Sequence, residues 1–277
     1  MNKKIYILLL LIFDFVSFPI FSQSGSIYNS PALCNTTNKA FKGGEKIKYK
    51  IYYNWGLLWV PAGYVEFEVN EKKDQYYLKA KGKTYPSYSW LFSVDDYFYS
   101  YVDKQTIKPK YAKRDIEEGD YKIFNEINFN QTAGTATSYV KENDDAPKNL
   151  SFTYDNCMFD LLSLIYKLRN IEIDKMKVGE EINFQILLDS EVYDLNLEYL
   201  GKNPSVQVNG MGKFKAFKIS PTVIKGRVFD QNERMNVWIS DDKAKLPLII
   251  ESPLAVGKIK VILQEYENII GNLAKVE

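Results

Sequence analysis

The chain has 277 residues, of which 36 are lysine or arginine and 35 are aspartate or glutamate, so its formal net charge is +1. Nucleic-acid-binding proteins usually carry a basic excess or a basic stripe. This chain has neither, so we expect no nucleic-acid partner. The chain contains no histidine, which removes the most common general base and transition-metal ligand, so we expect no metal site and no cofactor.

The first 22 residues have the layout of a secretory signal peptide. Two lysines precede an apolar run that begins at Ile5, and small polar residues follow it from Ser22 onward. Asp14 and Pro19 interrupt the run, which leaves it short of the ~20 apolar residues that a transmembrane helix needs. We therefore expect residues 1–22 to be a signal peptide, with no transmembrane span. We expect export to the periplasm or to the periplasmic face of the outer membrane.

Residues 23–40 are polar and rich in turn-forming residues, and we interpret them as an N-terminal arm. This arm contains Cys34, and the second cysteine of the chain is Cys157. In an oxidising compartment two cysteines are most simply explained by a disulfide, so we predict a structural bond between them. The alternative, a nucleophilic Cys157, lacks a histidine partner.

Residues 41–270 are predicted to form a single β-rich domain, followed by a C-terminal tail at residues 271–277. Short runs in which apolar and polar residues alternate recur throughout this region, and turn residues separate most of them. The first two runs, KIKYKIYY and YVEFEV, predict a hairpin in which lysines of one strand face glutamates of the other. No repeat of fixed length is present, so we expect one antiparallel, strongly curved sheet or an incomplete barrel.

The stretch YNWGLLWVPAG, Tyr53–Gly63, joins these two runs and combines turn residues with apolar ones. We interpret it as a connection that is longer than the about two to five residues of a typical hairpin loop. In one interpretation its tryptophans form a hydrophobic plug over an end of the sheet. In the other, the stretch is a lip at the mouth of a groove, and its candidate ligand-binding residues are Trp55, Leu57, Leu58 and Trp59.

One segment breaks the alternation. Residues 155–170 carry apolar residues at helical spacing, with Asp155 as a possible N-cap, and predict the one substantial helix. Apolar residues lie around most of its circumference, so we expect it to be buried inside or across the curved sheet. Asp160 lies on this helix and needs a buried partner, so we interpret it as a structural anchor. A shorter helical turn is expected at residues 86–93.

The chain shows no catalytic motif, and we expect no enzymatic activity. The acidic pairs Asp95–Asp96 and Asp241–Asp242 are candidates for acid/base catalysis or for calcium binding. However, adjacent residues on a strand point to opposite faces of the sheet, so neither pair aims two carboxylates at one substrate. We interpret the second pair as part of a turn. A hydrolase remains the weakest alternative for the function.

The chain contains, in this order, the stretches FKGGEKIKYKIYYNWGLLWVPAGYVEFEV, CMFDLLSLIYKLRN and VWISDDKAKLPLIIESPLAVGKIKVILQEY. Together they resemble the bacterial exported family called domain of unknown function 3108, in its Bacteroidetes-type branch. The matching residues are Phe41, Gly44, Glu45, Tyr49, Tyr53, Trp55, Ala62, Gly63, Cys157, Phe159, Asp160, Leu162, Ser163, Trp238, Ser240, Asp241, Asp242 and Pro247. The resemblance implies a single β-rich domain in the cell envelope and transfers no activity.

Two classes of function fit these expectations. The first is a non-enzymatic binder or carrier of a hydrophobic ligand, such as a lipid or an acyl chain, held between the curved sheet and the buried helix. The second is an interaction or assembly protein that docks on an outer-membrane partner through exposed apolar residues or a sheet edge.

Overall fold

The computed structural model describes residues 31–55, 58–90, 92–222, 234–254 and 257–276. The predicted signal peptide and Leu57 lie outside these residues. The strands are β1 (Lys46–Trp55), β2 (Leu58–Lys72), β3 (Gln75–Thr84), β4 (Asp95–Asp103), β5 (Pro109–Glu118), β6 (Tyr121–Asn130), β7 (Thr135–Glu142), β8 (Lys148–Thr153), β9 (Glu181–Leu188), β10 (Glu191–Val208), β11 (Gly212–Pro221), β12 (Asn236–Ser240), β13 (Pro247–Pro253) and β14 (Lys258–Glu267). The helices are α1 (Pro31–Asn35), α2 (Leu161–Leu168) and the short 3₁₀ helix η1 (Ile173–Lys175).

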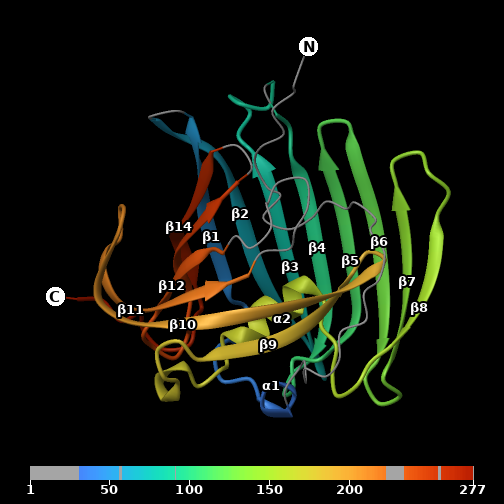
Figure 1. The fold of residues 1–277 in the computed structure, drawn as a ribbon. Coiled ribbons are helices and arrows are strands. Elements are labelled where there is room, and N and C mark those ends of the chain that lie inside the picture. Colours follow the sequence, from blue (N-terminus) through green and yellow to red (C-terminus); the bar gives the residue numbers. More distant parts are fainter. Residues whose placement is uncertain (1–30, 56–57, 91, 223–233, 255–256, 277) are drawn as a thin grey trace.

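These fourteen strands form one antiparallel sheet in the order β8-β7-β6-β5-β4-β3-β2-β1-β14-β13-β12-β11-β10-β9. The first and last strands pair in the middle of the sheet, and β8 and β9 form its two edges. The sheet curves strongly, so that β9 and β10 pass in front of α2 while β3 and β4 lie behind it (Figure 1). Register shifts in β10 help it to bend, as β-bulges do. The predicted curved, unclosed sheet with a buried helix is confirmed.

The β1–β2 hairpin corrects the prediction of a long apolar connection. The two strands continue through the stretch, with Tyr53 opposite Val60 and Trp55 opposite Leu58, and only two residues lie between them. A register shift after Ile51 accommodates Pro61, which has no N–H to donate to the ladder. Pro61 was therefore mistaken for a turn residue, although it sits beside a bulge within β2.

The predicted charge pairing of this hairpin is confirmed. Lys46 lies opposite Glu68 and Lys48 lies opposite Glu66. The Nζ of Lys48 is 3.2 Å from a carboxylate oxygen of Glu66. Both side chains are partly exposed, so the pair contributes little to stability and mainly favours this register.

The helix α2 is shorter than the predicted segment, and its N-cap is Asp160 rather than Asp155. The residues before Asp160 are extended because Phe159 pairs with β9, where its carbonyl oxygen accepts from the amide of Leu187 at 2.9 Å. The Asp160 carboxylate accepts from the amides of Leu162 and Ser163, and the Ser163 hydroxyl accepts in return from the amide of Asp160. This capping box fixes the start of the helix in the interior.

A short helical turn was expected at residues 86–93, and the described part of this segment forms hydrogen-bonded turns at residues 86–90 without a regular helix. The amide of Phe92 donates to the carbonyl oxygen of Tyr88 at 3.2 Å, which closes a single α-type turn. No helix among the residues with described structure is long and apolar enough to cross a membrane.

The predicted disulfide is confirmed, since Cys34 is bonded to Cys157 with their Cα atoms 5.8 Å apart. Both cysteines are buried, and the bond ties α1 to the segment that leads into α2. At the other end of the chain, residues expected as a tail contact the sheet. Leu273 is buried, and the amide of Lys215 on β11 donates to the carbonyl oxygen of Ala274 at 2.8 Å.

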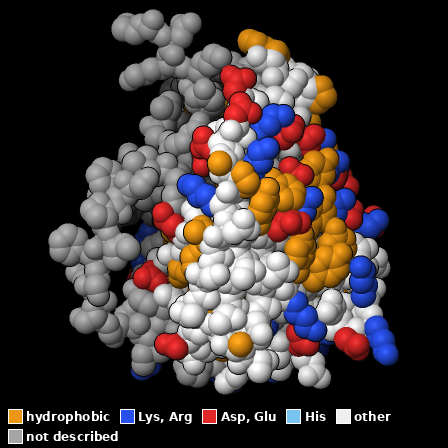
Figure 2. All heavy atoms as spheres, turned by 90° about the vertical axis from the view of Figure 1, so that its right-hand side faces the viewer, with side chains coloured by type: hydrophobic (Ala, Val, Ile, Leu, Met, Phe, Trp, Pro, Cys, Tyr) orange, Lys and Arg blue, Asp and Glu red, His pale blue; other side chains and the backbone are white. Residues whose placement is uncertain are grey.

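The convex face of the sheet carries a ladder of tyrosines on neighbouring strands. The rings of Tyr77 and Tyr99 are stacked with centroids 5.9 Å apart, and Tyr101 contacts both Tyr77 and Tyr111. Lysines such as Lys72 lie over these rings. Figure 2 shows hydrophobic-class side chains, which include tyrosine, interleaved with charged side chains on this side of the molecule. Such cross-strand aromatic pairs stabilise a solvated sheet face.

Candidate ligand-binding cavity

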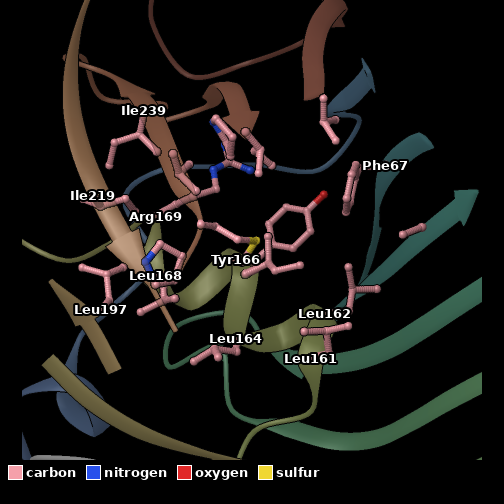
Figure 3. A pocket seen from close by; sticks show the side chains of 18 of the residues that line it. Phe67, Leu161, Leu162, Leu164, Tyr166, Leu168, Arg169, Leu197, Ile219 and Ile239 are labelled. Carbon is pink, nitrogen blue, oxygen red and sulfur yellow. The ribbon is translucent and has the colours of Figure 1, made fainter. Parts of the chain in front are cut away.

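A cavity of about 280 Å³ lies between α2 and the concave face of the sheet. This volume is close to the lower end of the ~300–1,000 Å³ range of small-molecule sites. One wall comes from β1–β4, α2 provides one side, and the other wall comes from β9–β14. Figure 3 shows Phe67 on one wall, Leu161 and Leu168 on α2, and Leu197, Ile219 and Ile239 on the opposite wall.

The strand alternation explains why the walls are apolar. Residues two apart on one strand share a face, so Tyr49 follows Ile47 and Phe67 follows Val65 on the concave side. Alternate positions such as Lys48 point to the convex side. The cavity surface is therefore built by the same pattern that builds the surrounding core.

The helix α2 explains why space remains. Leu162, Leu164 and Tyr166 are buried against neighbouring core, whereas Leu161 and Leu168 keep some accessible surface. All five of these α2 residues line the cavity. A void beside apolar side chains forfeits the dispersion contacts that a close-packed core would provide. Nonpolar groups placed in this space would restore these contacts.

A buried ion pair fixes the C-terminal end of α2 at the cavity. The two Nη atoms of Arg169 donate to the two carboxylate oxygens of Glu45 at 2.6 and 2.9 Å. Its Nε donates to the carbonyl oxygen of Ala244 at 2.9 Å, and Nη2 also donates to that of Ala40 at 3.1 Å. Both charged side chains are almost completely buried. The pair is bidentate and well satisfied, so it positions the helix and leaves the local charge balanced.

Tyr166 is one of the few polar residues that line the mostly apolar cavity. The residue is 1% exposed, and its hydroxyl oxygen has no hydrogen-bond partner. Its ring meets that of Phe41 edge-on at 4.7 Å, and the Arg169 guanidinium lies 5.2 Å from the ring centroid. Burial raises the pKa of Tyr166 well above its ordinary value, so the hydroxyl keeps its proton.

Next to the cavity, the concave face of β5–β7 carries a buried polar cluster that apolar side chains such as Ile116 and Ile127 surround. Arg114 on β5 forms a buried ion pair with Asp189, which lies in the turn between β9 and β10. The Asp189 amide donates to the side-chain oxygen of Asn125 at 3.3 Å, and the Ser138 hydroxyl donates to the Asp189 carbonyl oxygen. These contacts hold the β9–β10 turn against β5–β7 and help to keep the sheet curved.

The acidic pairs singled out in the sequence are separated by the fold. Asp95 points outward and accepts from the Nζ of Lys83 at 2.8 Å, whereas Asp96 is buried and lines the cavity. Burial raises the pKa of Asp96 to about 7, although the Arg114 charge and the Glu117 amide act in the opposite direction. Asp242 accepts from the amides of Ala244, Lys245 and Ala274, in the turn that the sequence predicted. Across the part of the chain with described positions, no three His, Cys, Asp or Glu side chains are grouped to hold a metal ion.

Two of the residues proposed from the sequence as a binding lip, Leu58 and Trp59, are not among the described residues that line this cavity. Leu58 is 71% exposed and Trp59 is 42% exposed at the start of β2, where Lys260 lies 5.0 Å from the Trp59 ring centroid. Trp55 ends β1, and nothing is described of its side chain or of Leu57. The apolar residues on most sides of the predicted helix correctly indicated that it is buried. They did not indicate that a cavity lies beside it.

Comparison with solved structures supports the fold. The chain is similar to a beta-barrel-like protein of domain of unknown function DUF1849 from Brucella abortus, with a TM-score of 0.55 and 11% sequence identity over 84% of this chain and 100% of that one. At this identity the likeness concerns the fold alone. A candidate lipoprotein from Parabacteroides distasonis and a candidate exported protein with a YmcC-like fold from Bacteroides fragilis match 84% of this chain and 99% of theirs, at 9% and 10% identity. Their TM-scores of 0.28 are too low to support an argument.

Comparison with curated proteins finds no significant match. The model of one family, described as protein of unknown function (DUF3108), matches residues 48–264, from β1 to β14. The match covers most of the chain and spans both walls of the cavity and α2. The chain therefore belongs to the DUF3108 family of proteins of unknown function.

Proposed function

We propose that this protein is an exported, non-enzymatic binder or carrier of a hydrophobic ligand, a lipid or an acyl chain, which occupies the cavity between α2 and the sheet. The observation that carries the proposal is a cavity of about 280 Å³ whose walls are almost entirely apolar. Small-molecule sites typically combine such walls with a few polar groups. Here Tyr166, Arg169 and Asp96 are among the polar residues that line it.

Export is supported by two independent features. The N-terminal sequence has the layout of a signal peptide, and the Cys34–Cys157 bond is of the kind that persists in oxidising compartments such as the periplasm. A carrier in the cell envelope would have access to lipids there. This role needs no catalytic group, and the chain contains no histidine.

The proposal is tested with diphenylhexatriene, an apolar probe that fluoresces when it leaves water. The purified protein is expected to bind it, and mass spectrometry of a solvent extract is expected to show a co-purified lipid. Ile165→Trp would fill part of the cavity and should weaken probe binding by about tenfold or more. Val178→Trp, at an exposed site away from the cavity, is the matched control. No probe binding, or equal binding by both variants, would contradict the proposal.

A second candidate function is docking on an outer-membrane partner. It is favoured by Leu58, Trp59 and Trp90, which are 71%, 42% and 79% exposed. The β1–β2 and β3–β4 connections lie at the same end of the strands (Figure 1). Leu58 and Trp59 begin β2 beside the first connection, and Trp90 lies within the second. Exposed aromatic and aliphatic side chains at one edge are typical of contact surfaces.

A further inference from the structure

Tyr166 carries a buried hydroxyl that the protein itself leaves without a partner. The residue is 1% exposed, and its oxygen makes no hydrogen bond in the structure. Buried side-chain polar atoms in folded proteins are bonded in the large majority of cases, so each exception calls for an explanation. In Figure 3 this oxygen projects away from α2 toward Phe67 on the facing wall, and both residues line the cavity.

The charged neighbours of this hydroxyl are already occupied. The two carboxylate oxygens of Glu45 both accept from Arg169, which also donates to two backbone carbonyl oxygens. A water molecule would be a poor partner, because a buried water typically makes about two to four hydrogen bonds and the facing side chain, Phe67, is apolar. An acceptor that is itself attached to an apolar chain fits this position best.

The charge balance indicates which acceptor. Because Glu45 neutralises Arg169, no uncompensated positive charge stands beside Tyr166. A carboxylate placed there would lose its hydration without gaining a counter-ion, which is strongly unfavourable. A neutral carbonyl oxygen would accept one hydrogen bond and introduce no charge. Lys245 also lines the cavity, and its Nζ donates to the carbonyl oxygen of Asp242 at 3.4 Å.

We infer that the ligand is an uncharged acyl ester whose carbonyl oxygen lies inside the cavity and accepts a hydrogen bond from the Tyr166 hydroxyl. This inference rests on the proposed function and names its substrate class. The acyl chain contacts the apolar walls, and Tyr166 sets the depth at which the ester group stops. Tyr166 is thus a specificity-determining residue that distinguishes an ester from a plain hydrocarbon.

The test is displacement of diphenylhexatriene by three competitors of equal chain length: a fatty-acid methyl ester, the corresponding alkyl methyl ether and the free fatty acid at about pH 8. The ester and ether differ in the carbonyl group. The native protein is expected to bind the ester about fivefold more tightly than the ether, the effect of one neutral hydrogen bond. It should also prefer the ester to the ionised acid.

Tyr166→Phe should abolish the preference for the ester and leave affinity for the ether and the probe unchanged. Since it removes a hydroxyl without a partner, this variant should unfold at the same or a higher urea concentration than the native protein. Tyr199→Phe, a buried tyrosine that does not line the cavity, is the control and should keep the preference.

The outcomes separate this inference from the proposed function. If the probe binds but ester and ether compete equally, or the preference survives Tyr166→Phe, the inference is wrong while the apolar binding function stands. Tighter binding of the ionised acid would also overturn it and would point to Lys245 instead. If neither the probe nor any competitor binds, both proposals fail.

Discussion

The concave face of the sheet has two halves that are filled in different ways. Under β1–β3 and β9–β14, apolar side chains and α2 surround a cavity of about 280 Å³. Under β5–β7, Arg114 is paired with Asp189, Asn125 contacts the same turn, and the adjacent void measures only about 20 Å³. The first half keeps a cavity, whereas side chains fill almost all of the second half.

The difference follows from the directionality of the forces. A buried charge is strongly unfavourable unless its partner lies at hydrogen-bond distance, so the polar half is stable in one arrangement only. Burial of apolar surface is not directional, so the apolar half tolerates a ligand in several positions. The Arg114–Asp189 pair and its neighbours under β5–β7, here called the polar half, therefore help to fix the curvature of the sheet. The half around the cavity, here called the apolar half, is the proposed site for a nonpolar ligand. Each prediction below tests one side of this comparison.

The largest effect is expected in the polar half. Arg114→Met leaves the Asp189 carboxylate buried without its counter-ion, and should lower the free energy of unfolding by about 3–5 kcal/mol. Urea unfolding followed by tryptophan fluorescence measures the change. The double variant Arg114→Met/Asp189→Leu should recover part of the loss, because the Asp189 carboxylate is then no longer buried without a counter-ion. A single variant within about 1 kcal/mol of the native protein would mean that this pair does not hold the turn.

In the apolar half, Leu162→Ala should cost about 2–5 kcal/mol, the range for cavity-forming changes in a core. Leu162 is buried on α2, packs with the cluster around Leu78 and also lines the cavity. No charge is left unpaired, so the variant should fold and bind a bulkier apolar probe in the enlarged space. A loss below about 1 kcal/mol in urea unfolding would show that α2 is not packed as described.

Asp96 lies between the two halves and predicts a pH dependence. Its pKa is raised by burial to about 7 from an ordinary value of 3.8, so between these values the folded protein holds a proton that the unfolded chain releases. The free energy of unfolding should therefore fall as the pH rises from about 4 to about 7, and this contribution should level off above that.

Asp96→Asn removes this titration and keeps an oxygen to accept from the Glu117 amide. The difference in the free energy of unfolding between variant and native protein should be roughly 1 kcal/mol or more larger at pH about 8 than at pH about 5, in favour of the variant. One pKa unit corresponds to about 1.4 kcal/mol. Urea unfolding at both pH values measures the difference. A gain that is the same at both values would show that Asp96 does not titrate in this range.

The features that the sequence predicted correctly depend on local patterns. The alternation in each run is a property of neighbouring residues, and so is the helical spacing between Leu161 and Leu168. The disulfide was predictable because the chain has only two cysteines. The facing lysines and glutamates of the first hairpin follow from strand register.

The features that were missed depend on contacts between distant segments. Asp160 rather than Asp155 caps α2 because Phe159 pairs with β9, which follows the helix in the chain. Arg114 shares a strand face with Ala112 and Ile116, yet nothing local indicates that Asp189 is its partner. The cavity residues were missed for a related reason. An apolar side chain beside a void has the same sequence pattern as one in a packed core, and only the curvature of the sheet separates the two.

The smallest effect is expected at the β1–β2 tip, which belongs to neither half. Leu58→Ser should change the free energy of unfolding by less than about 1 kcal/mol, because the side chain is 71% exposed. Since Leu58 does not line the cavity, the affinity for diphenylhexatriene should stay within about twofold of the native value, less than 0.5 kcal/mol. Trp90→Ser, at the same edge of the sheet, should behave in the same way. If instead the probe affinity drops in Leu58→Ser while stability is kept, the β1–β2 tip forms the entrance through which a ligand reaches α2. The apolar half then extends to this end of the strands. If probe binding is unchanged but association with outer-membrane vesicles is lost, the tip is a docking surface that works independently of the cavity.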